Sequence, residues 1–138
     1  MLILTVGADV QGDRVELSTV GHTRDGAARV LAHDIVWGSP LENKTWAEVD
    51  TLLGRHWVHP RGGIIRVDAA VIDSGNWADS VYAFTRPRTS RRIVAGKGVA
   101  GFHRQAVAWG NSRKTRLALI GSYAGFWVTR LDQAARFS

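Results

Sequence analysis

Hydrophobic and polar positions alternate over the first part of the chain and then change to helical spacing. Three segments, residues 2–9, 14–21 and 27–37, carry the alternation that is typical of β-strands. Short polar turns at residues 11–13 and 22–26 separate them, and Gly12-Asp13 suits a tight hairpin. The pattern therefore predicts an antiparallel meander of three strands.

A helix is expected after the meander. Thr45 begins it, because Glu48 follows three residues later as in a capping box. Five apolar residues with helical spacing are expected to face the core: Trp46, Val49, Leu52, Leu53 and Trp57. The segment from Pro60 to Gly63 ends this helix.

The second half of the pattern alternates strands with helices. Residues 64–73 are predicted as a buried strand, and Asn76 is predicted to cap a second helix that Pro87 stops. Residues 91–95 form a short fifth strand. Signals weaken after residue 99, where residues 117–120 are expected as a last strand and residues 123–136 as a terminal helix.

Two of the predicted strands end in an acid. Asp73 follows a mostly apolar strand and precedes the Ser74-Gly75 turn, so it either caps the next helix or faces water, a cation or a ligand. Asp9 ends the first strand in the same way. If the two strands lie side by side and parallel, the carboxylates come within a few ångström and repel unless a proton or cation lies between them. A divalent cation that prefers oxygen, Mg²⁺ or Mn²⁺, would satisfy this requirement.

The order of the predicted elements indicates a fold class. Three meandering strands followed by a right-handed helical crossover place the fourth strand beside the first. This is the ribonuclease H-like arrangement: an α/β fold with a mixed central sheet, an antiparallel three-strand meander plus parallel strands, flanked by helices. We expect one domain over residues 1–138, with the least defined pattern at 122–138.

Composition excludes several classes of protein and points to a partner. The 138 residues are 45% hydrophobic with 6 Trp, which predicts a globular chain, and the absence of cysteine excludes disulfides, thiolate zinc sites and a Cys nucleophile. No apolar run approaches the ~20 residues of a membrane span, so a soluble, cytoplasmic protein is expected. Residues 1–85 hold 7 Lys/Arg against 11 Asp/Glu, whereas residues 86–138 hold 11 against one, Asp132. This basic half suits a polyanionic partner, and a solvated basic surface is the alternative.

Four motifs together resemble a known family. They are GADVQGDRVEL at Gly7 to Leu17, TWAEVDTLL at Thr45 to Leu53, AAVIDSGNWADSVYAF at Ala69 to Phe84 and AGKG at Ala95 to Gly98. In order and spacing, over about residues 2–100, they are similar to the nuclease domain of phage terminase large subunits of the lambda-like DNA-packaging branch. The resemblance implies a ribonuclease H-like endonuclease that cuts concatemeric viral DNA during packaging, in the cytoplasm of the bacterial host.

The resemblance also implies site residues and partners. Asp9 and Asp73 would be metal ligands, Gln11 would lie near the site, and Lys97 would contact phosphate or be a solvated loop lysine. Double-stranded DNA, the terminase ATPase domain, the small terminase subunit and the portal are the implied partners. A phosphate-binding loop of the form G-x-x-x-x-G-K-[ST] is absent, so we expect an excised nuclease domain or a prophage remnant.

The mechanism implied is two-metal phosphodiester hydrolysis, with two Mg²⁺ or Mn²⁺ ions. Asp9 would bridge the ions, Asp73 would hold one, and Asp132, the only acid after Asp79, would hold the other or be a surface acid. The basic second half would follow the DNA backbone, with Arg91 and Arg92 as contacts on opposite faces of their strand. Two alternatives stay open: a catalytically incomplete DNA-binding module, and an actin-like phosphotransferase half, for which the loop after the first strand is too short.

Overall fold

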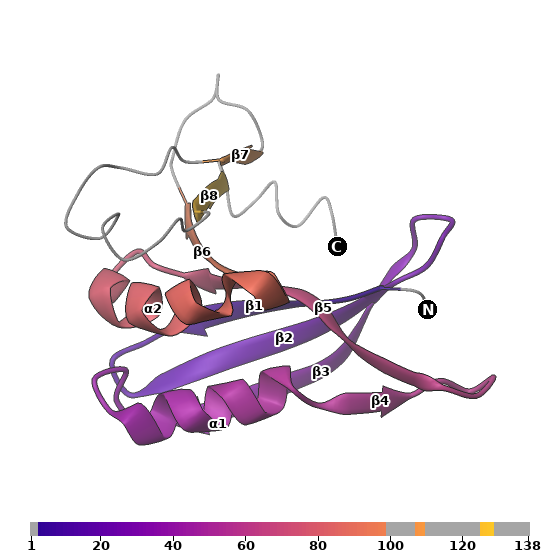
Figure 1. Cartoon of the computed structure of the whole chain (residues 1–138), viewed down its shortest axis with the longest axis horizontal. Coiled ribbons are helices and arrows are strands. Elements are labelled where there is room, and N and C mark those ends of the chain that lie inside the picture. Colours follow the sequence, from indigo (N-terminus) through magenta and orange to yellow (C-terminus); the bar gives the residue numbers. More distant parts are fainter. Residues whose placement is uncertain (1–2, 99–106, 110–124, 129–138) are drawn as a thin grey trace. The chain divides into compact units, whose positions relative to one another are not determined.

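The computed structural model describes residues 3–98, 107–109 and 125–128 (Figure 1). Its contacts divide the chain into two compact units, Met1–Ala70 and Val71–Ser138. The expectation of one domain over the whole chain stays a prediction.

The first unit opens with the predicted meander. Strands β1 (Ile3–Val10), β2 (Arg14–His22) and β3 (Ala28–Trp37) pair in antiparallel order. The first turn is tight, because the Gln11 amide donates to the Arg14 carbonyl at 2.8 Å. The antiparallel meander is therefore confirmed, with one irregularity in the β2–β3 register between Thr19 and Val20.

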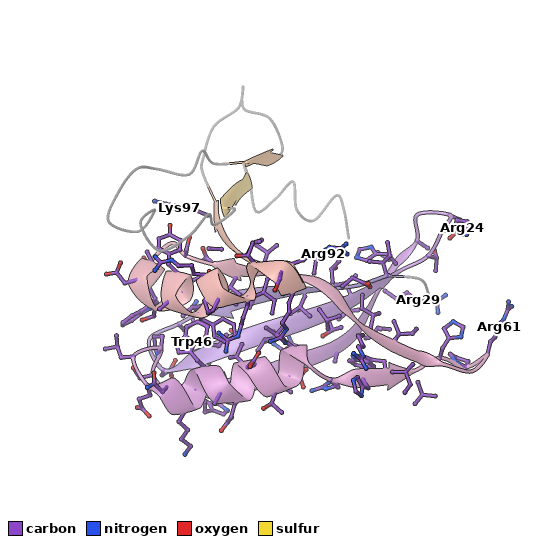
Figure 2. The ribbon with its side chains drawn as sticks, in the orientation of Figure 1. Arg24, Arg29, Trp46, Arg61, Arg92 and Lys97 are labelled. Atoms are coloured by element: carbon purple, nitrogen blue, oxygen red, sulfur yellow. The ribbon has the colours of Figure 1, made fainter. Side chains whose placement is uncertain are left out.

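One face of the meander is buried and the other is open. Even-numbered residues of β1 and odd-numbered residues of β2 are buried, and the β1–β2 register places them on the same face. Helix α1 (Asn43–Leu53) contacts β2 and β3, and its buried residues include Trp46, Val49 and Leu53. The Trp46 indole also donates to the Pro40 carbonyl at 2.7 Å, so this large side chain is buried with its polar atom satisfied (Figure 2).

The helix differs from its prediction at both ends. It begins at Asn43 with Glu42 in the cap position and has no side-chain cap, so the capping box at Thr45 is wrong. Thr45 is buried inside the helix instead, beside Gly38, whose φ of +143° and close approach to the Thr45 hydroxyl leave no space for a Cβ. The helix ends at Leu53, one residue before Gly54, so Trp57 is not part of it. Trp57 lies in a short strand, β4 (His56–Val58), which pairs antiparallel with β5.

Strand β5 (Ile64–Asp73) begins in the first unit and ends in the second. The described strands follow the order β3-β2-β1-β5-β6-β8-β7, with β4 beside β5, so the fourth long strand lies next to the first as expected. This order, in a mixed sheet with two α-helices, confirms the ribonuclease H-like fold class. The most buried residues of β5 are Ala70 and Ile72, which share one face of the strand with Arg66 and Asp68.

The second unit contains the end of β5, helix α2 (Ala78–Thr85), the 3₁₀-helix η1 (Arg86–Arg91) and strand β6 (Ile93–Gly98). Two short strands, β7 (Val107–Trp109) and β8 (Gly125–Val128), complete its described part. Strand β8 pairs parallel with β6 and antiparallel with β7. The core residues are Ile72, Val81, Phe84, Ile93 and Ala95.

Several boundaries in this unit correct the sequence predictions. Trp77, not Asn76, holds the cap position of α2. Helix α2 ends at Thr85, just before Pro87 as expected, and the chain continues as the 3₁₀-helix η1, which tolerates proline in its first turn. Strand β8 replaces the start of the helix that was expected over residues 123–136, and the strand expected at 117–120 lies outside the described residues.

Candidate active site

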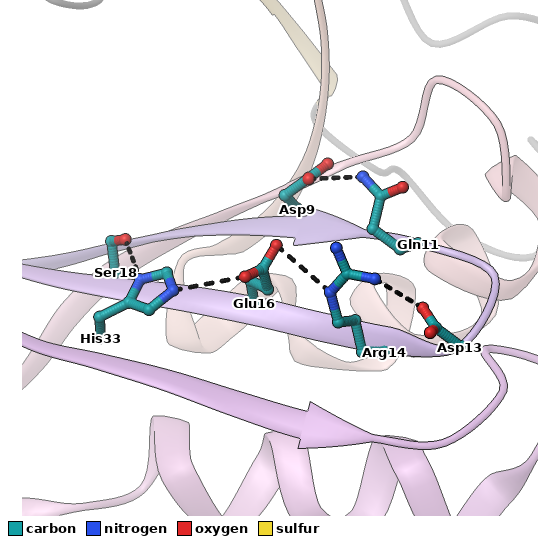
Figure 3. Close-up of polar contacts among 7 residues, drawn as sticks. All are labelled: Asp9, Gln11, Asp13, Arg14, Glu16, Ser18 and His33. Carbon is teal, nitrogen blue, oxygen red and sulfur yellow. Dashed lines mark hydrogen bonds and ion pairs between the residues drawn. The ribbon is translucent and has the colours of Figure 1, made fainter.

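Asp9 lies on the open face of the meander, near the end of β1. Its side chain is exposed, as expected for an odd-numbered residue of this strand. The Gln11 side-chain amide donates to Asp9 Oδ2 at 2.6 Å (Figure 3). Gln11 therefore lies beside the first candidate ligand. The other carboxylate oxygen of Asp9, Oδ1, has no hydrogen-bond donor among the described residues.

A second acid, Glu16, faces Asp9 across the β1–β2 ladder. The two residues are direct partners in the antiparallel register, so their side chains emerge on the same face. Arg14 Nε and His33 Nε2 each lie 3.5 Å from a Glu16 carboxylate oxygen (Figure 3). Arg14 also donates a hydrogen bond to the Asp13 carboxylate, and this bond raises the pKa of the Arg14 guanidinium. Arg14 therefore supplies a permanent positive charge next to Glu16.

Sequence reasoning missed Glu16, although the signal was present. A tight turn at residues 11–13 fixes the register of the two strands that it joins. With this register, the residue opposite Asp9 can be counted directly from the turn, and it is Glu16.

Gly7 places no side chain on the open face of β1, two residues before Asp9. A Cβ built at Gly7 would meet no atom within 4 Å, so packing does not require a glycine here. A glycine inside a strand commonly marks a place where a ligand or another backbone approaches closely. Because Gly7 and Asp9 share a face, the surface next to this carboxylate has room for a ligand.

Asp73 is the last residue of β5 and is half-buried. It accepts a hydrogen bond from the Gly75 amide at 3.0 Å through Oδ1, which closes a local turn. Helix α2 begins only at Ala78 and has no side-chain cap, so Asp73 does not act as the helix cap that the sequence left open. Its other carboxylate oxygen has no hydrogen-bond donor among the described residues.

Ser74 fixes the chain immediately after Asp73. Its amide and its hydroxyl both donate to the Gly96 carbonyl, at 2.7 and 2.9 Å, and its side chain is buried. The sequence pattern identified Ser74 only as part of a turn. In the structure, this residue joins the end of β5 to β6.

Replacing Ser74 with alanine is expected to lower the free energy of unfolding by about 0.5–1.5 kcal/mol. The cost stays in this range because the Ser74 amide still donates to the Gly96 carbonyl, so no buried acceptor loses its last donor. Urea unfolding followed by tryptophan fluorescence measures the change. A loss above about 3 kcal/mol would show that the hydroxyl has a larger role than this single bond.

The other predicted site residues have different outcomes. Lys97 is exposed in β6, so it belongs to a strand and not to a loop. Arg91 ends η1, and Arg92 follows with a left-handed φ of 56° before β6 begins at Ile93. The prediction that these two arginines lie on opposite faces of a strand is therefore wrong, because η1 extends past Pro87. Asp132 lies outside the described residues.

The donor atoms of Asp9 and Asp73 are of the type that Mg²⁺ and Mn²⁺ prefer, since both are carboxylate oxygens. Asp9 belongs to the first unit and Asp73 to the second, and their joint binding of metal stays a prediction. Within the described ranges, no three His, Asp or Glu side chains form a group that could hold a metal ion.

The strand order and the two acid-bearing strands define this chain as an α/β protein of the ribonuclease H-like class. A family comparison is more specific: residues 1–127 match the endonuclease domain of terminase large subunit gpA. The chain belongs to this family, as the four sequence motifs indicated. A comparison with curated proteins finds no match.

Two solved structures are similar to part of the chain. One is T. thermophilus RuvC in complex with a Holliday junction substrate, at 17% identity and a TM-score of 0.44, covering 69% of this chain and 63% of that one. The other is Thermus thermophilus RuvC, at 18% identity and a TM-score of 0.43, covering 69% and 60%. The chain thus spans less than two thirds of either structure. In the described part of this chain, neither α-helix has the length and apolar character to cross a membrane.

Proposed function

We propose that this chain is a metal-dependent endodeoxyribonuclease that cuts concatemeric viral DNA during packaging in the host cytoplasm. Membership of the terminase endonuclease-domain family supports the reaction class. The observation that carries the metal dependence is the position of the two acids, each at or near the end of a central strand. Each has one carboxylate oxygen without a hydrogen-bond donor among the residues that the structure describes.

Asp9 and Asp73 would hold two Mg²⁺ or Mn²⁺ ions, with Asp132 as the third ligand. When bound, such ions neutralise charge on the scissile phosphate and make water a better nucleophile. Gln11 would orient Asp9 through its 2.6 Å hydrogen bond, leaving one oxygen for the metal. Ser74 would hold the backbone after Asp73, so that this carboxylate keeps its position when DNA binds.

DNA would bind through its phosphates. Lys97 is exposed on β6, and Arg91 and Arg92 are exposed at the end of η1, so all three can contribute positive charge from the second unit. Partners in the packaging machine would be the terminase ATPase domain, the small terminase subunit and the portal. These partners follow from the family resemblance.

Plasmid nicking tests the proposal. With Mn²⁺ at low salt, supercoiled plasmid should convert to the nicked form, and an excess of EDTA should stop the conversion, because the carboxylates alone cannot activate water in this way. Gel electrophoresis measures the two forms over time. Nicking that continues in EDTA would contradict metal dependence, and DNA binding without nicking would identify a binding module in place of a nuclease.

A further inference from the structure

The first unit has a net negative charge, yet its arginines without an ion pair lie toward one end of it. It contains nine Asp/Glu and seven Lys/Arg. Arg14 pairs with Asp13 and Glu16, and Arg55 donates to Asp34 at 2.9 Å. Four further arginines in this unit are exposed and form no ion pair with the described acids: Arg24, Arg29, Arg61 and Arg66.

These arginines belong to two hairpins. Arg24 lies in the turn between β2 and β3, and Arg29 is the second residue of β3. Arg61 lies in the turn between β4 and β5, and Arg66 stands opposite His56 in the ladder below that turn. Figure 2 shows Arg24, Arg29 and Arg61 toward the same end of the unit, within or next to the two hairpin turns.

The acids near this end have other partners. Asp25, in the same turn as Arg24, accepts a hydrogen bond from the Thr23 hydroxyl, which lowers the pKa of Asp25. Asp68 accepts a hydrogen bond from the Leu4 amide at 2.8 Å. Neither of these acids forms an ion pair with Arg24, Arg29 or Arg61 in the described part of the unit, so the three guanidinium groups can interact with groups outside it.

The distance from the β2–β3 turn to Asp9 matches a few nucleotides of DNA. Ile3, at the start of β1, pairs with His22 just before the β2–β3 turn, and Asp9 lies six positions after Ile3. At ~3.3 Å per residue, this stretch of strand spans about 20 Å. Phosphates along one strand of duplex DNA are ~3.4 Å apart along the axis, so 20 Å corresponds to about six nucleotides.

We propose that Arg24, Arg29 and Arg61 form a phosphate-binding clamp that holds duplex DNA, with the β2–β3 turn about six nucleotides from the phosphate at Asp9. This inference rests on the proposed nuclease function. The clamp is independent of the basic second half of the chain, because it is built from hairpin tips within the acidic half. It contacts phosphates and not base edges, so it positions the duplex without reading sequence.

Salt-dependent DNA binding tests the clamp. The triple variant Arg24→Gln, Arg29→Gln, Arg61→Gln is compared with wild type by fluorescence anisotropy on a 30-base-pair duplex in EDTA, so that cleavage does not interfere. Each lost phosphate contact reduces the slope of log K against log salt by about 0.9. The triple variant should therefore lose two to three contacts from the slope and bind at least about tenfold more weakly at ~50 mM salt.

Lys44→Gln provides the matched control. Lys44 is an exposed cation in the first turn of α1, away from both hairpin tips, and its replacement removes a charge of the same sign. Its slope should equal that of wild type. Circular dichroism melting checks that the triple variant is folded, as expected for exposed side chains with no ion pair to lose.

The two proposals fail in different ways. If wild type does not bind duplex DNA, the proposed function is wrong. If wild type binds and the triple variant has the same slope and affinity as Lys44→Gln, only the clamp is overturned. A reduced slope with unchanged Lys44→Gln behaviour supports the clamp, whether or not the protein cuts.

Discussion

Replacing Asp9 with asparagine is expected to reduce metal-dependent nicking by about a thousandfold. Asparagine has nearly the same shape, and its side-chain oxygen can still accept the hydrogen bond that Gln11 donates to Asp9. What it lacks is the negative charge that would hold a divalent cation. Metal ions contribute several kcal/mol of charge stabilisation in phosphoryl transfer, and each ~1.4 kcal/mol corresponds to a factor of ten.

The same loss is expected for Asp73→Asn, because both carboxylates are needed for the proposed pair of ions. Asp79→Asn is the control, since Asp79 is an exposed acid in the first turn of α2, close to Asp73 in sequence, with no role in the proposed site. Initial nicking rates at saturating Mn²⁺ measure the effect. Wild-type rates for Asp9→Asn would remove Asp9 from the metal site and, with it, the main support for the mechanism.

Binding should respond differently from cleavage. Asp9 is negatively charged, so its neutralisation removes repulsion of the DNA backbone and should leave DNA affinity in EDTA unchanged or slightly higher. Anisotropy in the presence of EDTA measures this. A variant that loses both binding and nicking would point to misfolding, which circular dichroism detects.

The meander was predictable because its signals are local and agree with one another. Strict alternation over β1 and β2, joined by the Gly12-Asp13 turn, specifies pairing partners that lie 5 to 19 residues apart, within a single hairpin. The position of β5 beside β1 was predictable from connection rules once the helix between them was recognised. These inferences did not depend on side chains that are distant in sequence.

The errors arose where two periodicities fit the same residues. Trp57 has helical spacing from Leu53, yet Gly54 ends α1 and the segment that follows pairs with β5. Only the presence of β5 as a partner decides for the strand, and no local pattern contains that information. Pro87 correctly marked the end of α2, but η1 was missed, because proline at the start of a 3₁₀ turn removes no hydrogen bond.

In the candidate site too, local sequence signals located some residues, whereas contacts between distant residues became evident only in the structure. Strand ends located Asp9 and Asp73, and only the structure decided that Asp73 closes a turn with Gly75 and does not cap α2. The contact of Ser74 with Gly96 joins residues 22 positions apart, so no sequence spacing could reveal it. The assignment of Asp132 as the third ligand stays a prediction.

Replacing Ile72 with alanine should give the largest loss of stability among the substitutions considered. Ile72 has 0% exposure in the core of the second unit, one residue before Asp73. Removing buried methyl and methylene groups costs their transfer free energy and leaves a cavity, together about 2–5 kcal/mol for isoleucine to alanine. For a protein of this size, we expect the melting temperature to fall by roughly 10 °C or more.

Ile64→Ala is the matched control, because it makes the same chemical change at the other end of β5. Ile64 is 66% exposed, so its truncation removes little buried surface and should cost less than about 0.5 kcal/mol. Urea unfolding of the two variants and wild type, followed by tryptophan fluorescence, gives the difference between the two positions. Equal losses at Ile72 and Ile64 would contradict the burial of the C-terminal half of β5, and with it the packing that supports Asp73. A loss confined to Ile72 is the expected result, because that strand end is held by core side chains and by the Ser74–Gly96 contact, whereas the strand start is not.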